Sequence, residues 1–195
     1  MPRAVEGPAL RFAPELLLKA QGRALGLRAA IFDVDGVLTD GRLYIGEHGE
    51  QVKAFHALDG HGLKLLLAGG IVPLIVSGRD SPALRRRVAD LGLPHAVYGA
   101  GDKLAAAEGL LDTLGTDWAD VAAIGDDWPD LPLLQRCAFA GASANAHAEV
   151  KAVADYVTQA AGGHGAAREF CDLLLVAAGR YAALLQSQRA TLDAR

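Results

Sequence analysis

Residues 31–41 read IFDVDGVLTDG, an apolar run that ends in two carboxylates one residue apart and then a glycine. This arrangement suits phosphoryl transfer through a covalent intermediate, in which Asp33 would attack phosphorus and Asp35 would handle the proton of the leaving oxygen. Gly36 lets the backbone turn sharply after the pair. The stretch therefore predicts a buried strand that carries a nucleophile and an acid/base at its carboxyl end.

The composition is that of a globular protein. Of 195 residues, 51% are hydrophobic and 22% are charged, which supplies enough apolar side chains for a packed core. The net charge is −4 and no basic run is longer than residues 85–87, so the sequence does not favour nucleic acid as a partner. An anionic substrate would have to be met by local positive charge.

Cysteine usage and hydropathy bear on where the protein acts. Cys137 and Cys171 lie far apart in the sequence, so neither a disulfide scaffold nor a cysteine-rich zinc site is expected. The longest apolar stretch, residues 65–76, is interrupted by glycine and proline and is too short to span a bilayer. We therefore expect a protein of the reducing cytoplasm with no membrane partner.

Apolar runs of strand length alternate with helical patterns along the chain. These runs are apolar at every position, which indicates burial on both faces and hence a parallel sheet between helices. Ser81 and Asp102 precede predicted helices, while Gly69 and Gly92 follow them, as helix start and stop signals should. The predicted strands are residues 29–32, 71–76, 96–98, 121–124, 138–140 and 155–157, and the predicted helices between the main strands are residues 60–68, 82–91 and 103–114.

The fold class we predict is α/β, with one domain over residues 1–195. No internal repeat or low-complexity linker divides the chain. A short helix over residues 14–22 is expected before the sheet, and a final helix over residues 166–185 after it.

Residues 42–55 depart from the alternating pattern. They look like two strands around a glycine-containing turn, inserted after the first strand of the sheet. A hairpin at this place lies beside the two carboxylates, so we interpret it as a flap over the site. The alternative is a surface ornament with no role in chemistry.

Polar residues follow several predicted strands. The carboxyl ends of parallel strands form the edge at which ligands bind in open α/β sheets. This edge therefore collects a nucleophile, an acid/base, a hydroxyl, a fixed cation and metal-binding carboxylates, which are the parts that phosphoryl transfer demands. The residues concerned are Asp33, Asp35, Ser77, Arg79, Lys103 and Asp126.

Magnesium is the metal that these side chains favour. The hard oxygen atoms of Asp33 and Asp126 suit a small cation that also coordinates phosphate. The ion and Lys103 would reduce the repulsion between the nucleophile and an incoming phosphate dianion. Asp35 can offer its backbone carbonyl to the metal and keep its side chain for the proton.

In this order and context, the motifs resemble those of the haloacid dehalogenase superfamily of phosphohydrolases. Asp33 and Asp35 match the first motif, Ser77 the second and Lys103 the third, while the acidic fourth motif is matched by Asp126, Asp127 and Asp130. The resemblance implies a modified Rossmann fold and a covalent aspartyl-phosphate on Asp33. It also implies magnesium held by Asp33, the Asp35 carbonyl and Asp126.

Residues 27–180 resemble more closely those members that hydrolyse a sugar-acid phosphate on the route to lipopolysaccharide. These are similar in having a small hairpin in place of a large cap domain, and their hairpins associate in a homotetramer, so that one subunit completes another's site. Leu58 departs from the pattern, because many members carry arginine there, whose guanidinium can hold a carboxylate. The positions implied to bind substrate are Asp35, His56, Ala57, Leu58, Asp59, Gly60, Lys64, Arg79, Arg87 and Lys103.

Other interpretations remain open at this point. The chemistry could serve another substrate, such as N-acylneuraminate 9-phosphate, or another acceptor, as in a phosphomutase. A non-catalytic relative that assembles through its hairpins is a third hypothesis. Asp127 and Asp130 could cap a helix instead of supporting the metal site, and Arg87 and Lys64 could lie on solvated helix faces.

Overall fold

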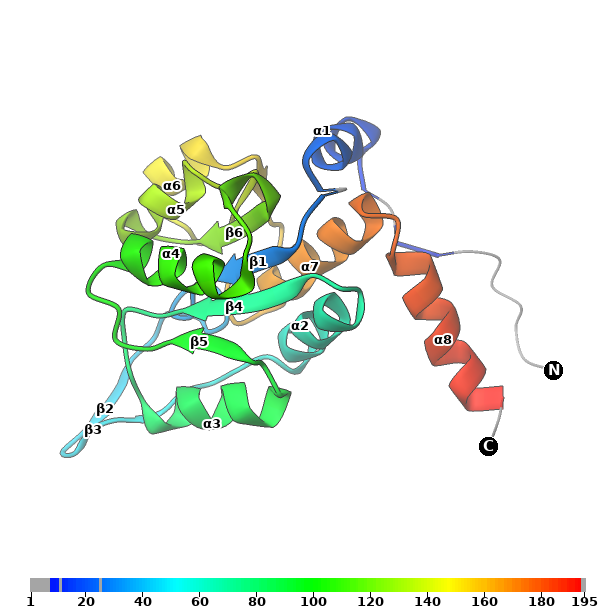
Figure 1. Ribbon diagram of the computed structural model, residues 1–195. Helices are drawn as coiled ribbons and strands as arrows, with labels where there is room; N and C mark the ends of the chain where they lie inside the picture. The colour runs from blue at the N-terminus through cyan, green and yellow to red at the C-terminus, as the bar shows by residue number, and fades with distance from the viewer. Residues whose placement is uncertain (1–7, 11, 25, 194–195) are drawn as a thin grey trace.

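The computed structural model describes residues 8–10, 12–24 and 26–193. Its eight strands are β1 (Ala29–Phe32), β2 (Tyr44–Gly46), β3 (Gly49–Val52), β4 (Val72–Val76), β5 (His95–Val97), β6 (Val121–Gly125), β7 (Phe139–Ala142) and β8 (Tyr156–Val157). Six of them form one sheet in the order β5-β4-β1-β6-β7-β8, and β2 and β3 form a separate antiparallel hairpin (Figure 1). Every pairing in the six-stranded sheet is parallel, which confirms the predicted α/β fold class.

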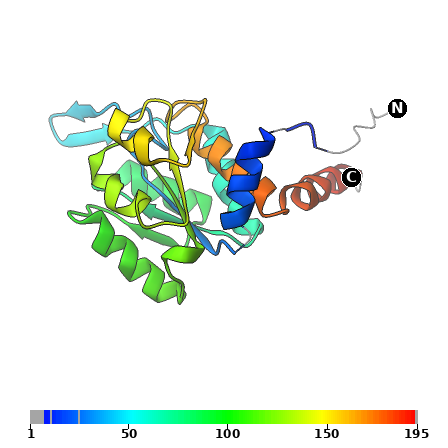
Figure 2. The ribbon, with the colours of Figure 1, turned by 90° about the horizontal axis from the view of Figure 1, so that it is seen from above.

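Helices cover both faces of the sheet. One face packs mainly against α2 and α7 and the other against α4, α5 and α6, whereas α1 lies across α7 (Figures 1 and 2). The helices are α1 (Pro14–Ala24), α2 (Ala57–Ala68), α3 (Pro82–Leu91), α4 (Lys103–Leu114), α5 (Leu131–Leu134), α6 (Ala148–Val153), α7 (Ala166–Ala177) and α8 (Tyr181–Asp193), with 3-10 turns η1 (Trp118–Asp120) and η2 (Trp128–Asp130).

The central strand β1 explains why its residues are apolar at every position. Ala30 and Phe32 point into the hydrophobic cluster that contains α2 and α7. Ala29 and Ile31 point into the opposite cluster, which contains α4. Because successive side chains of a strand face opposite sides, a strand buried on both faces has no polar position until it ends. The first polar residue of this strand's continuation is Asp33.

The helix boundaries follow the capping signals in the sequence. The Ser81 hydroxyl accepts from the backbone N–H of Leu84, and the Asp102 carboxylate accepts from two backbone N–H groups at the start of α4. These side chains satisfy donors that have no partner within the helix. Gly92 ends α3 in the left-handed conformation, and Gly69 ends α2, as predicted.

The hairpin β2–β3 extends away from the body of the molecule, on the side opposite α8 (Figure 2). Its apolar side chains are largely exposed, with 63% of Ile45 accessible to solvent. The exposed set consists of Leu43, Tyr44, Ile45 and Val52, which we call the hairpin patch.

The expected helix over residues 166–185 is wrong in one respect, because the structure has two helices there. Gly179 adopts a φ of 70°, a left-handed conformation that ends α7. The guanidinium of Arg180 then donates to the carbonyl of Gly69 at 2.6 Å, which fixes the direction in which the chain leaves. The axes of α7 and α8 differ by 105°. Sequence periodicity alone does not register a break of three residues between two apolar helices.

Other boundaries differ by a few residues. α2 begins at Ala57, three residues before the predicted start, and α1 continues to Ala24. The short helices α5 and α6 were not predicted, because four to six residues are too few for a helical period to emerge. The single domain over residues 1–195 stays a prediction.

No single helix within the described residues is long and apolar enough to cross a membrane. Taken together, the bent pair α7–α8 is long and apolar enough to cross a membrane, by length and composition only.

We expect Phe170→Ala to lower the free energy of unfolding by about 3–5 kcal/mol, because it removes a large buried ring and leaves a cavity. Phe170 packs edge-on against Phe32 and stacks on Phe139, with ring centroids 6.1 Å apart in both pairs. Urea unfolding of the variant measures the loss. Leu18→Ala, at a position 70% exposed, is the control and should change stability by about 0.5 kcal/mol or less. Equal effects of the two substitutions would contradict this packing.

Candidate active site

A cavity of about 700 Å³ lies beyond the carboxyl ends of β1, β4 and β6. This is the edge at which ligands are expected in an open parallel sheet. Five of the predicted site residues line it, namely Asp33, Asp35, Arg79, Lys103 and Asp126, together with Gly41, Gly78, Ala100, Gly101, Asp102, Leu104, Asp127, Pro129, Asp130 and Pro132. The structure therefore brings together residues from four separate segments of the chain.

Lys103 bridges two buried carboxylates in this cavity. Its Nζ lies 2.6 Å from Oδ1 of Asp33 and 2.7 Å from Oδ1 of Asp130. Both carboxylates are almost completely buried, and these two charges raise the pKa of the Lys103 ammonium against the opposing effect of its own burial. Lys103 therefore stays charged and compensates the acidic groups around it.

Burial, and next the charge of Asp130, raises the pKa of Asp33 well above its ordinary value, although Lys103 opposes the shift. The same two causes raise the pKa of Asp126 to about 6. Three carboxylates are thus held close together with one ammonium between two of them. A further positive charge in the cavity would relieve this repulsion.

Oxygen atoms of Asp33, Asp126 and Asp130 all lie within 4.8 Å of one another. A cluster of carboxylate oxygen atoms suits a hard divalent cation such as magnesium. Asp33 and Asp126, which the sequence predicts as magnesium ligands, are both members of this cluster. Asp130 is the additional member, and its other oxygen, Oδ2, accepts from the backbone N–H groups of Asp126 and Asp127 at 3.0 and 3.3 Å.

Gly36 brings the loop after β1 against Asp126. A Cβ added at Gly36 would lie 1.9 Å from a carboxylate oxygen of Asp126, and the residue has a φ of 98°. The Gly36 carbonyl accepts from the Ser143 hydroxyl and the Asn145 amide, both at 3.0 Å. Sequence reasoning missed Ser143 and Asn145, since neither belongs to a motif and both are far from residue 36 in the chain.

Ser77 is fully buried at the end of β4, and its hydroxyl oxygen accepts from the backbone N–H of Arg79 at 3.1 Å. It is not among the residues that line the cavity, whereas its neighbours Gly78 and Arg79 are. The geometry therefore gives Ser77 a clear part in shaping the loop after β4.

Asp35 is held by a residue that sequence reasoning gave no role. The carboxylate of Asp35 forms an ion pair with Lys53, which also lies 2.6 Å from Oε1 of Glu50 in the hairpin strand β3. The signal in the sequence was only a lysine at the end of the predicted hairpin, and this gives no hint of a contact across the loop after β1.

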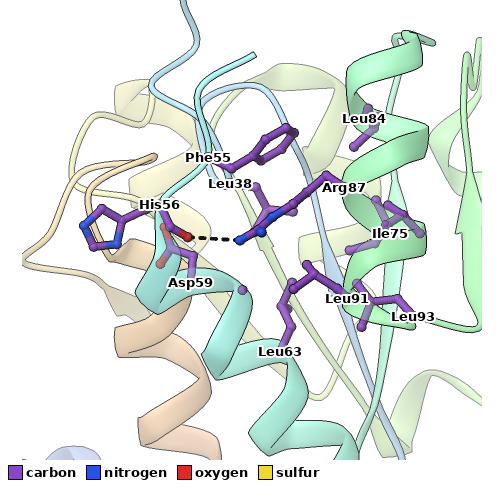
Figure 3. Close-up of a pocket in the computed structure, with 12 residues that line it drawn as sticks. Leu38, Phe55, His56, Asp59, Leu63, Ile75, Leu84, Arg87, Leu91 and Leu93 are labelled. Carbon is purple, nitrogen blue, oxygen red and sulfur yellow. Dashed lines mark hydrogen bonds between the residues drawn. The ribbon is translucent and has the colours of Figure 1, made fainter. Parts of the chain in front are cut away.

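The remaining predicted substrate residues are not in this cavity. His56, Asp59, Gly60 and Arg87 line a separate narrow space of about 10 Å³ between α2 and α3, drawn in Figure 3. Ala57, Leu58 and Lys64 are exposed on α2, and Leu58 faces a groove beside the start of α7. Within one chain, therefore, the structure does not bring these residues to the carboxylates.

Arg87 is directed into the narrow space by local packing. Its guanidinium lies over the ring of Phe55, 5.7 Å from the centroid, and donates to the carbonyl of His56 at 3.4 Å (Figure 3). Asp59 also borders this space, but its carboxylate accepts from the backbone N–H of Arg168 at 2.8 Å and so holds the start of α7. Asp59 thus joins two helices.

A buried carboxylate beside a fixed lysine, a second carboxylate two residues later and an acidic cluster are the groups that a phosphohydrolase site needs. Residues 96–170 match the family of haloacid dehalogenase-like hydrolases. The chain is 42% identical over 168 residues to 3-deoxy-D-manno-octulosonate 8-phosphate phosphatase of Salmonella typhimurium. The matched residues cover 86% of this chain and 87% of that relative. The enzyme of the same name from Escherichia coli strain K12 is 43% identical over 158 residues, or 81% and 84% of the two chains.

Solved structures agree with these sequence relatives. The phosphatase of the same name from Yersinia pestis has a TM-score of 0.80 at 41% identity, covering 84% of this chain and 88% of that one. The one from Moraxella catarrhalis, solved with magnesium, phosphate and a KDO molecule, has a TM-score of 0.82 at 37% identity, covering 90% and 99%.

The chain is a haloacid dehalogenase-like hydrolase that acts on phosphoric monoesters. Within this class it belongs to the family of the 3-deoxy-D-manno-octulosonate 8-phosphate phosphatases.

We expect Asp126→Asn to stabilise the metal-free protein at high pH. The pKa of Asp126 is raised to about 6 in the folded chain, while an aspartate in the unfolded chain ionises near pH 4. The wild type therefore loses stability as the pH rises from about 4 to about 6 and stays less stable above that, by at most roughly 3 kcal/mol. Thermal unfolding in a chelator, at pH 4.5 and pH 8, measures the difference between the variant and the wild type.

The gain from Asp126→Asn should be large at pH 8 and small at pH 4.5. Saturating magnesium should reverse the order at pH 8, because the wild type then binds the ion with a full set of carboxylates. An equal effect of the substitution at both pH values, with and without magnesium, would argue against this electrostatic cluster.

Proposed function

We propose that this protein hydrolyses 3-deoxy-D-manno-octulosonate 8-phosphate to the free sugar acid and inorganic phosphate, with magnesium as cofactor. The observation that carries the proposal is the position of Lys103 between Asp33 and Asp130, on the wall of a cavity that also contains Asp35 and Asp126. Relatives of that name over more than four fifths of the chain support the substrate, in preference to N-acylneuraminate 9-phosphate.

Asp33 is proposed as the nucleophile. Its carboxylate oxygen attacks phosphorus, the bond from phosphorus to the sugar oxygen breaks, and Asp35 gives its proton to the leaving oxygen. Asp35 then takes a proton from water, the water oxygen attacks phosphorus, and cleavage of the aspartyl-phosphate releases inorganic phosphate and regenerates Asp33. Two easier displacements thus replace one difficult step.

Lys103, Ser77 and the metal site lower the electrostatic barrier. Lys103 places a fixed positive charge next to the nucleophile. The Ser77 hydroxyl accepts from the N–H of Arg79 and so holds the loop in which Gly78 and Arg79 line the cavity, and the backbone N–H of Gly78 is the proposed donor to a phosphoryl oxygen atom. Asp33, Asp126 and the carbonyl of Asp35 would hold magnesium. The positive charge of the ion would offset the negative charges of the nucleophile and the phosphate.

We propose that the sugar acid is bound by Arg79 and by residues of a neighbouring subunit. Arg79 lines the cavity, but His56, Ala57, Leu58, Asp59, Gly60, Lys64 and Arg87 do not lie there within one chain. Within one chain these residues lie apart from the carboxylates of the cavity. We therefore propose that they reach the substrate bound in the cavity of a neighbouring subunit. Leu58 offers no charge to the sugar carboxylate, so Arg79 and Lys64 are the proposed partners for it.

The oligomer we propose is a homotetramer in the cytoplasm, assembled through the hairpin patch. Leu43, Tyr44, Ile45 and Val52 expose apolar surface on an element that extends from the body of the protein. Exposed apolar patches of this kind mark association surfaces. The two cysteines are free thiols, which suits a reducing compartment.

Asp33→Asn is expected to reduce phosphate release by at least about a thousandfold, because the amide is not a nucleophile although it fills the same volume. The assay follows inorganic phosphate from the octulosonate 8-phosphate, N-acylneuraminate 9-phosphate and simple sugar phosphates, each with magnesium and with a chelator.

The matched control is Asp112→Asn, an exposed position on α4, which should retain wild-type rates. A tenth of wild-type activity in the Asp33 variant, or wild-type turnover in a chelator, would refute the mechanism. Faster hydrolysis of the neuraminate ester than of the octulosonate ester would refute the substrate.

Ile45→Glu is expected to shift the protein from a tetramer to smaller species. A carboxylate at the centre of the hairpin patch would have to be desolvated in the interface. Sedimentation or light scattering measures the mass, and the phosphate assay should show a parallel loss of activity if subunits complete one another's sites. Glu47→Gln, on the exposed turn of the same hairpin, is the control. An unchanged mass in Ile45→Glu would show that association uses another surface.

A further inference from the structure

The side chain of Lys53 is buried between two carboxylates, although the residue directly follows a hairpin whose strands are mostly exposed. Only 1% of the side chain is accessible, and its ammonium group contacts Asp35 and Glu50. Asp35 retains 21% exposure toward the cavity, whereas Glu50 retains 7%. Buried lysines are rare unless paired, because the desolvation of an ammonium group costs several kcal/mol. The burial of the Lys53 ammonium group therefore indicates a role other than folding of the hairpin.

Among the residues that the structure describes, the hydrogen bond to the Asp35 carboxylate comes from Lys53. A carboxylate at the end of a short side chain can rotate about two bonds, so a single strong partner decides its orientation. Lys53 itself does not line the cavity, where Lys103 supplies the cation that faces the nucleophile. Its contacts are thus with the acid/base and the hairpin, not with the space that the phosphate would occupy.

We propose that Lys53 is a positioning residue that holds the Asp35 carboxylate in the orientation needed to protonate the leaving oxygen, and that Glu50 makes this orientation depend on the seating of the hairpin. The inference rests on the proposed function, since it assigns Asp35 the acid/base role.

The hairpin has the geometry for such coupling. Glu50 is the residue of β3 that turns its side chain inward, while its neighbours on the strand are exposed. Phe55, two residues after Lys53, packs against the main hydrophobic cluster and anchors the end of the hairpin. Displacement of the hairpin would move Glu50 and withdraw support from Lys53, and the acid/base would lose its orientation. Seating of the hairpin in an assembled oligomer thereby favours the productive arrangement of Asp35.

The test uses the dependence of the rate on the leaving group. A sugar alkoxide is a poor leaving group and needs the proton from Asp35, whereas p-nitrophenolate leaves without help. We compare kcat/KM for the sugar-acid phosphate with kcat/KM for p-nitrophenyl phosphate, because kcat/KM reports steps only up to departure of the leaving group. Hydrolysis of the aspartyl-phosphate, which is common to both esters, does not enter.

Lys53→Met is expected to lower kcat/KM for the sugar ester by at least about tenfold more than for the aryl ester, a part of the hundredfold or greater effect that general acid catalysis supplies. Lys53→Arg, which keeps the charge, should return the ratio of the two values to within about threefold of the wild type. Lys19→Met, on α1 and remote from the cavity, is the control and should leave both values unchanged.

Glu50→Ala keeps Lys53 but removes its contact with the hairpin, and should shift the same ratio in the same direction by at least about twofold. This variant also carries the test if Lys53→Met does not fold. An equal loss for both esters in Lys53→Met would overturn the proposal, because a phosphate-binding or purely structural lysine gives that result. An unchanged ratio in Glu50→Ala would overturn the coupling to the hairpin.

The activity of the wild type tests the proposed function independently of these ratios. A wild-type protein that hydrolyses neither ester refutes the proposed function and this inference with it. A wild type active on both esters, with an unchanged ratio in Lys53→Met, refutes the inference alone.

Discussion

The contact of Lys103 with both Asp33 and Asp130 is the interaction on which the arrangement of the site depends. Three carboxylates lie with oxygen atoms within 4.8 Å of one another, and two of them are almost fully buried. Like charges about 4 Å apart repel by roughly 4 kcal/mol at an effective dielectric constant near 20. The ammonium of Lys103 offsets much of that cost, so the start of α4 has to be fixed relative to β1 and η2. The remaining negative charge favours a divalent cation in the cavity.

Close approach of backbone segments fixes the carboxylates at these distances. Gly36 leaves no room for a Cβ beside the Asp126 carboxylate, and Gly125 leaves none beside the side chain of Asp130. Gly162 packs against the carbonyl of Gly36, and a Cβ there would come within 1.9 Å of the oxygen. Glycines at these contacts let the loops after β1 and β6 and the loop before α7 touch directly. A side chain at any of them would push the nucleophile and the acidic cluster apart.

The residues proposed for chemistry and most of those proposed for recognition occupy different parts of the chain. The groups proposed to act on phosphorus lie at the carboxyl ends of the central strands together with Arg79, while Lys64 and Arg87, also proposed to bind the sugar acid, lie on α2 and α3. The hairpin connects the two regions, since it begins after the nucleophile loop and leads through Lys53 and Phe55 into α2. An element in this place can transmit assembly of subunits to the acid/base. In the proposed oligomer, a second copy of the chain would cover the substrate in place of a large enclosing domain.

The sequence by itself determined the order of the main strands and of the helices between them, the strand ends at which Asp33, Asp35 and Asp126 stand, and the family to which the chain belongs. These features depend on local periodicity, on capping residues and on motifs of a few adjacent positions, all of which are legible along the chain. The tertiary structure alone decided four further features, namely the bend before α8, the inward position of Arg87, the bridge from Lys103 to Asp130 and the pairing of Lys53 with Asp35. Each of these is a contact between residues whose separation in sequence carries no periodic signal, and each arises because a buried charge or carbonyl takes whichever partner the packed fold brings within hydrogen-bond distance.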